Sequence, residues 1–174
     1  MNLEQLKYPI GKFQKPEHIT LAMINTWITE IHEFAKHIRR ETENLPDADL
    51  NRTYRPDGWT IRQLVHHCAD SHMNAFIRHK LCLTEDKPTI KPYREDLWAQ
   101  LPDSEMPIAS SLLILDGLCE RWFVFLQSLQ EPDFMRRFIH PESKKEFSLE
   151  ESIGLYAWHG NHHLAHIRIA KRAE

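Results

Sequence analysis

The stretch from Ser148 to Arg172, SLEESIGLYAWHGNHHLAHIRIAKR, decides the fold, because it predicts one long helix that carries the chain's most distinctive side chains. Ser148 and Glu151 fit a capping box, which marks a helix start. Four of the chain's 12 histidines lie inside this stretch, in a run of eight residues. His159 and His163 are four residues apart, so their rings project from one helix face about one turn from each other. A helix uses this spacing to give two imidazole ligands to one metal ion.

The spacing alone leaves a second pair open, because His162 and His166 are also four residues apart. At roughly 100° per residue, however, the face of His159 and His163 is the one that apolar side chains flank. These are Leu149, Ile153 and Ile167 on one side and Leu155, Trp158 and Ile169 on the other. We therefore predict that His159 and His163 point into the core and that His162 and His166 lie farther round. The alternative is a pair of core histidines hydrogen-bonded to hydroxyls or carboxylates.

Three further segments have the apolar periodicity of long helices. The predicted helices cover residues 17–43, 60–84, 107–130 and 148–172. Four amphipathic helices in one chain of 174 residues predict an all-α, four-helix bundle in a single domain. The long connection over 85–106 allows the second and third helices to run parallel, which gives an up-down-down-up order. Residues 1–16 are predicted as a non-helical lead-in, and residues 138–147 as a short hairpin.

A third metal ligand is expected from the second helix, which starts at a predicted capping box of Thr60 and Gln63. His67, Asn74 and Arg78 fall on one line along the edge of its apolar stripe. We predict His67 as the ligand. His72 and His79 fall nearer the centre of the stripe and are expected to be packed core histidines, whereas His66 points away from it.

Asp70 lies one turn beyond His67 and is a candidate general base or a hydrogen-bond acceptor behind the ligand. The alternative is a solvated helix carboxylate. Gly160 follows His159, so the H-E-x-x-H glutamate of metalloproteases is missing. Three histidines leave a metal with open positions, which is the catalytic arrangement. A zinc- or nickel-type ion there lowers the pKa of a bound water or thiol.

Composition excludes several classes of function. The formal net charge is -3 and there is no basic stripe, which argues against nucleic-acid binding. No run of about 18 apolar residues exists, so no membrane span is expected. The N-terminal residues contain no apolar core typical of a secretory signal. Three cysteines without a C-x-x-C motif predict buried, reduced thiols in a cytoplasmic protein.

Five motifs in order resemble the YfiT branch of the DinB-like superfamily, a family of metal-dependent hydrolases also linked to bacillithiol transfer. They are YPIG (8–11), YRPDGWT (54–60), VHHCADSHMN (65–74), KPY (91–93) with WA (98–99) and LPDS (101–104), and YAWHGNHHLAHI (156–167). The resemblance implies one such bundle domain over residues 1–174, a homodimer, and one divalent metal ion per subunit held by His67, His159 and His163. Ile77 and Leu81, which lie off the core stripe, are candidates for the dimer contact.

Three functions follow from this site as hypotheses. The first is a metal-dependent hydrolase of small molecules, and the second is an S-transferase that delivers a low-molecular-weight thiol such as bacillithiol to an electrophile. The third is a non-enzymatic metal-binding stress protein. Zinc or nickel is the expected metal. Asn74, Arg78 and Tyr93 are the candidate substrate-binding residues.

Overall fold

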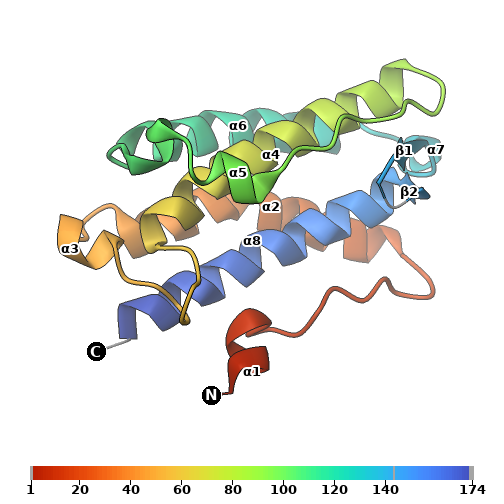
Figure 1. Cartoon of the computed structure of the whole chain (residues 1–174). Helices are drawn as coiled ribbons and strands as arrows, with labels where there is room; N and C mark the ends of the chain where they lie inside the picture. The colour runs from red at the N-terminus through yellow and green to blue at the C-terminus, as the bar shows by residue number, and fades with distance from the viewer. Residues whose placement is uncertain (1, 143, 173–174) are drawn as a thin grey trace.

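Four long helices form a bundle in the computed structural model, which describes residues 2–142 and 144–172 (Figure 1). They are α2 (Leu21–Thr42), α4 (Ile61–Thr84), α6 (Ala109–Gln127) and α8 (Leu149–Arg172). Both α2 and α4 pack against α6 and α8. In Figure 1, α2 and α8 run in one direction while α4 and α6 run in the other. The expected up-down-down-up bundle is confirmed, and it makes α4 and α8 antiparallel neighbours.

Helix boundaries follow local capping. Thr60 Oγ1 accepts a hydrogen bond from the backbone N–H of Gln63, and the side chain of Gln63 accepts one from the N–H of Thr60. This confirms the predicted capping box of α4. At the start of α8, Ser148 Oγ accepts from the N–H of Glu151 at 3.3 Å. The first long helix begins at residue 21 instead of 17, because Thr20 Oγ1 caps it by accepting from a backbone N–H of its first turn.

Short elements fill the connections. They are α1 (Leu3–Lys7), α3 (Asp47–Leu50), α5 (Glu95–Trp98), the 3₁₀ helix η1 (Pro102–Glu105), α7 (Glu131–Phe134), β1 (Arg137–His140) and β2 (Lys145–Ser148). The prediction of a non-helical N-terminal segment was wrong for α1, which Asn2 and Gln5 start with a reciprocal capping box. Such single-turn helices lack a hydrophobic period, so periodicity does not reveal them.

The predicted hairpin is confirmed. β1 and β2 are antiparallel and pair Phe138 with Phe147. The long connection joins this hairpin, since Ile139 N donates to Pro88 O at 2.9 Å and Ile90 N donates to Ile139 O at 3.0 Å. The hairpin therefore fixes the first part of the segment that crosses from α4 to α6. No helix among residues 2–142 and 144–172 combines the length and hydropathy that crossing a bilayer requires.

The apolar core has two clusters of buried side chains. One includes Leu64 of α4 and Leu164 of α8, and the other includes Phe76 of α4 and Ile153 of α8. The histidine-rich middle turns of α4 and α8 lie between these clusters. The bundle thus places polar rings at mid-height, with apolar packing above and below.

Close packing of α2 against α8 depends on Gly160, the residue after His159. A Cβ atom at position 160 would meet the ring of Phe34 at 2.8 Å. The same ring stacks on His72, with centroids 4.6 Å apart and planes 13° apart. Phe34 therefore occupies the space that any side chain at 160 would need, which gives a physical reason for the missing H-E-x-x-H glutamate.

We expect Gly160→Ala to lower the free energy of unfolding by about 1–3 kcal/mol, because overpacking a closed core outweighs the helix propensity gained. Gly117 of α6 is the matched control, since nothing lies within 4 Å of a Cβ built there. Gly117→Ala should raise stability by about 0.5–1 kcal/mol. Urea titration of both variants measures this, and a Gly160→Ala protein as stable as the wild type would contradict the packing argument.

Candidate metal centre

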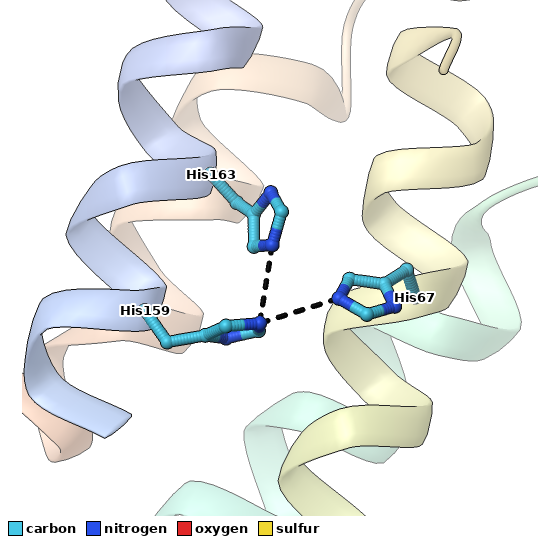
Figure 2. A group of neighbouring side chains, drawn as sticks. All are labelled: His67, His159 and His163. Carbon is cyan, nitrogen blue, oxygen red and sulfur yellow. Dashed lines mark hydrogen bonds between the residues drawn. The ribbon is translucent and has the colours of Figure 1, made fainter. Parts of the chain in front are cut away.

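Three histidine rings converge between α4 and α8 (Figure 2). His67 Nε2 lies 3.2 Å from His159 Nε2, and His163 Nε2 lies 3.1 Å from the same atom. The ligand atoms of the three residues all lie within 4.8 Å of one another. The structure brings together the three histidines that the sequence selected, and it leaves His162 and His166 outside this cluster.

Burial keeps all three rings neutral. Loss of solvation lowers the pKa of His67 to about 3 and holds the pKa values of His159 and His163 well below 6.5. A neutral imidazole nitrogen offers either one N–H or one lone pair. His159 Nε2 can make only one hydrogen bond and therefore cannot pair with the Nε2 atoms of His67 and His163 at the same time. A cation among three lone pairs satisfies all three atoms, so the donor set fits a metal ion that favours imidazole.

A hydrogen-bond chain sets the tautomer of His163. His166 Nε2 donates to the carbonyl oxygen of Lys7 at 3.2 Å, so its Nδ1 is left as an acceptor. His163 Nδ1 lies 3.4 Å from that atom and donates to it. This leaves the lone pair of His163 on Nε2, where it faces the other two rings. Such backing of a ligand histidine is a common feature of metal sites.

The N-terminal segment helps to orient the histidines, a role that the sequence analysis did not predict. Besides the Lys7 contact, Trp158 Nε1 donates to the carbonyl oxygen of Gly11 at 3.2 Å. Gly11 adopts φ +77°, a conformation that favours glycine. Residues 7–11 therefore lie along α8 beside the histidines. The YPIG motif was the only sequence signal for this role.

Two aromatic rings from the YRPDGWT segment pack on the cluster from another side. The Trp59 ring lies 4.6 Å from the His67 ring, and Tyr54 stacks on His166 at 3.8 Å. Asp57 between them has φ 55°. Aspartate tolerates this left-handed conformation better than most residues do. The turn places Trp59 against His67 of the cluster and Tyr54 against His166, which backs His163.

His79 and His72 are core residues, as their place in the stripe predicts. Trp122 Nε1 donates to His79 Nδ1 at 3.1 Å, and His79 Nε2 donates to Ser152 Oγ at 2.8 Å. Because Nε2 carries the proton, His79 cannot act as a base for Ser152. This geometry argues against a serine nucleophile. His72 is completely buried, and no residue in the described part of the chain forms a hydrogen bond with its Nε2.

His66 differs from expectation, since it is buried instead of pointing away from the core. Its Nδ1 lies 2.7 Å from Ser111 Oγ, and its Nε2 lies 3.0 Å from the carbonyl oxygen of Met106. The connection before α6 covers this face of α4, and the helical wheel of α4 alone cannot show that cover.

The three rings line a pocket of about 330 Å³. Arg78 and Tyr93, two of the predicted substrate-binding residues, also line it. Glu95 and Glu142 are pocket carboxylates that sequence reasoning missed, because they come from the connection and the hairpin, where no period places side chains. The remaining lining residues are Trp59, Ser71, Pro92, His140, Tyr156, Trp158 and His162.

Asp70 and Asn74 are not among the residues that line this pocket. Burial raises the pKa of Asp70 to about 6, and the nearby charge of Asp103 adds to the effect. Asn74 Nδ2 donates to the backbone carbonyl of Asp70 at 2.9 Å. Both residues therefore lie on α4 near the site without facing the histidines across the pocket.

Comparison with known proteins identifies the family. The sequence model of the DinB superfamily matches residues 30–167. The chain belongs to the DinB superfamily. It is 50% identical over 165 residues, 95% of either chain, to proteins of Bacillus cereus strain B4264 and Bacillus thuringiensis subsp. konkukian, each named "Putative metal-dependent hydrolase". The resemblance inferred from the five motifs is thus confirmed.

A solved structure shows the same architecture. YfiT from Bacillus subtilis, described as "a probable metal-dependent hydrolase with an unusual four-helix bundle topology", matches with a TM-score of 0.94 and 43% identity. The match covers 97% of both chains. The bundle and its topology are therefore those of the YfiT branch.

Buried neutral histidines predict acid sensitivity of the metal-free protein. The pKa of His72 is lowered to about 4 by burial, while an unfolded histidine titrates near 6.5. Between these pH values the unfolded state binds more protons than the folded state. The stability of the folded state relative to the unfolded state is therefore unaffected by this ring above about pH 6.5, and it falls as the pH decreases toward 4. Each such ring contributes about 1.4 kcal/mol per pH unit.

We expect urea titrations of the metal-free protein at pH 7, 6 and 5 to show falling stability. His72→Phe keeps a flat ring on Phe34 and removes one titrating group, so it should reduce the slope by about 1.4 kcal/mol per pH unit over the lower part of this range. A slope identical to that of the wild type would mean that His72 is not held neutral.

Proposed function

We propose that the protein is a metal-dependent hydrolase in which His67, His159 and His163 hold one divalent cation, zinc or nickel. The observation that carries this proposal is the convergence of three neutral, largely buried Nε2 atoms at the wall of a pocket. Similarity to relatives named as metal-dependent hydrolases supports it. A small molecule is the substrate that a pocket of this size accommodates.

When bound, such a cation supplies Lewis-acid chemistry and lowers the pKa of water or a thiol. The chain's own residues hold the ligands and the substrate. His166 fixes the lone pair of His163 toward the cluster, and Trp59 packs on His67. Arg78 and Tyr93 line the pocket and are proposed to contact the substrate. Asn74, which lies on the same helix and donates to the backbone carbonyl of Asp70, is proposed to assist substrate binding indirectly.

A group other than the glutamate of the H-E-x-x-H arrangement must move protons, because Gly160 stands at that position. Asp70 is proposed for this role, since its pKa of about 6 suits a group that gains and loses a proton near neutral pH. Glu95 and Glu142 are the alternatives, because they line the pocket itself.

A second cavity favours thiol S-transfer as the other candidate function. Its volume is about 470 Å³, and it shares Trp59, Glu95, His162 and His163 with the metal-centre pocket. Lys7 and Arg55 also line it, as do the carboxylates of Asp57, Glu95 and Asp96, and Arg55 Nε is buried without a hydrogen-bond partner among the described residues. Space on two sides of the histidines suits two organic substrates, whereas hydrolysis needs one substrate and water. A lining with charges of both signs suits a thiol such as bacillithiol, which carries an amine as well as carboxylates.

We also propose a cytoplasmic homodimer. Cys68, Cys82 and Cys119 are free and buried, which agrees with a reducing compartment. Ile77 is 56% exposed on α4, and Leu113 and Val124 are exposed on α6. These apolar side chains suit a contact with a second copy. Light scattering on the purified protein measures its mass in solution, and a monomer would contradict this part of the proposal.

The metal ligands are tested by elemental analysis of five alanine variants. We expect His67→Ala, His159→Ala and His163→Ala each to lose bound metal, because two imidazoles no longer enclose the ion. His72→Ala and His162→Ala are matched controls that should keep about one ion per chain. A metal-free His162→Ala protein together with a loaded His159→Ala protein would show that the other helical pair binds the ion.

Turnover separates the candidate functions. The metal-loaded protein is incubated with a panel of esters and amides, and separately with monochlorobimane and a panel of low-molecular-weight thiols. Hydrolysis that a chelator abolishes supports the hydrolase, and thiol-dependent conjugation that a chelator abolishes supports the transferase. If every substrate fails with and without metal, the third function, a non-enzymatic metal-binding stress protein, replaces both.

A further inference from the structure

Another cavity, which we call the hairpin cavity, opens beside the metal-centre pocket on the side of β1 and β2. Its volume is about 490 Å³. Arg78, His140, Glu142 and Tyr156 line both this cavity and the pocket of the three histidines. The two spaces therefore meet at these side chains, and a molecule that reaches the histidines can extend into the hairpin cavity.

Apolar side chains dominate the rest of the hairpin cavity. Phe138 and Phe147 are cross-strand partners whose rings stack with centroids 5.8 Å apart, and Leu155 of α8 completes the wall. The polar lining residue Ser152 already accepts the hydrogen bond from His79. Because cavities of this kind bind apolar groups of a ligand and two phenylalanine rings line this one, the lining matches an aryl group.

Arg78 stands at the junction of the two spaces with an unused hydrogen-bond donor. Its Nη2 donates to the carbonyl oxygen of Lys91 at 3.0 Å, and its guanidinium carbon lies 5.9 Å from the centre of the Tyr93 ring. Its Nε is buried and has no hydrogen-bond partner among residues 2–142 and 144–172. No ion pair joins Arg78 to Glu142 or to any other carboxylate in the described part of the chain.

The buried Nε–H of Arg78 lacks an acceptor beside the cavity, and the acceptor that a guanidinium binds most strongly is an anion. A buried donor without a partner is unfavourable by about 1–3 kcal/mol, and a charged one by more. The planar guanidinium binds a carboxylate through two parallel N–H donors. Tyr156 adds a phenolic O–H at the same junction, because it lines both cavities together with Arg78. Burial raises the pKa of this phenol, so it stays protonated and able to donate.

We infer that the substrate is an organic carboxylate that carries an aryl group. Arg78 and Tyr156 bind the carboxylate, the hairpin cavity holds the apolar group, and the reacting bond faces the three histidines. The position of the reacting bond rests on the proposed function. The two binding contacts do not depend on it.

Calorimetry on the metal-loaded protein tests this with three probes: 4-phenylbutanoate, 4-phenylbutan-1-ol and butanoate. The wild type should bind 4-phenylbutanoate at least tenfold more tightly than either of the others. The alcohol lacks the anion for Arg78, and butanoate lacks the ring for the hairpin cavity. Equal affinity for all three probes would overturn the inference.

Variants separate the two contacts. Arg78→Met should abolish the preference for carboxylate over alcohol and keep the preference for the ring, and Arg78→Gln gives a second test of the same contact. Leu155→Trp fills the hairpin cavity, so it should abolish the preference for the ring and leave butanoate binding unchanged. Arg121→Met on the exposed side of α6 is the matched control and should change none of the affinities. Circular dichroism and metal content verify each fold and metal centre.

The outcomes distinguish this inference from the proposed function. An Arg78→Met protein that still prefers carboxylate tenfold overturns the inference, even if metal-dependent turnover is observed with another substrate. Probe binding as expected, in a protein that never shows metal-dependent turnover, upholds the binding site and overturns the proposed function alone.

Discussion

Three neutral imidazole nitrogens that meet between the two halves of the apolar core are the constraint on which the rest of the structure depends. Each ring is removed from water, so each needs a partner, and the three Nε2 atoms approach one another so closely that they cannot all be satisfied by hydrogen bonds. A shared cation would resolve this conflict. The apolar clusters on either side supply the free energy that holds the polar band in place.

The topology brings the three histidines together. His67 and His159 are 92 residues apart in sequence, and they meet because α4 and α8 are antiparallel neighbours in the up-down-down-up bundle. The crossing segment that makes α4 and α6 parallel also provides Tyr93 and Glu95 to the pocket. The hairpin adds His140 and Glu142. The connections therefore have two effects: they allow α4 and α6 to run parallel, and they supply side chains that line the pocket.

Helical spacing made much of this predictable. The period of α8 separates His159 and His163 from His162 and His166, and the edge of the α4 stripe selects His67. Contacts between segments that are distant in the sequence follow no such periodicity, so it cannot predict them. The carbonyl of Lys7 that fixes His166, the Phe34 ring over Gly160 and the burial of His66 under Met106 each depend on which segment covers a helix face. The hairpin cavity depends on such contacts as well, and only the folded chain shows them.

X-ray absorption at the metal edge of the zinc- or nickel-loaded protein counts the imidazoles around the ion. A centre built from the three histidines should show three imidazole ligands, with metal–nitrogen distances of about 2.0–2.1 Å for zinc, together with oxygen ligands at the open positions. A spectrum with two or fewer imidazoles, or with a sulfur ligand from one of the buried cysteines, would contradict a centre built from His67, His159 and His163.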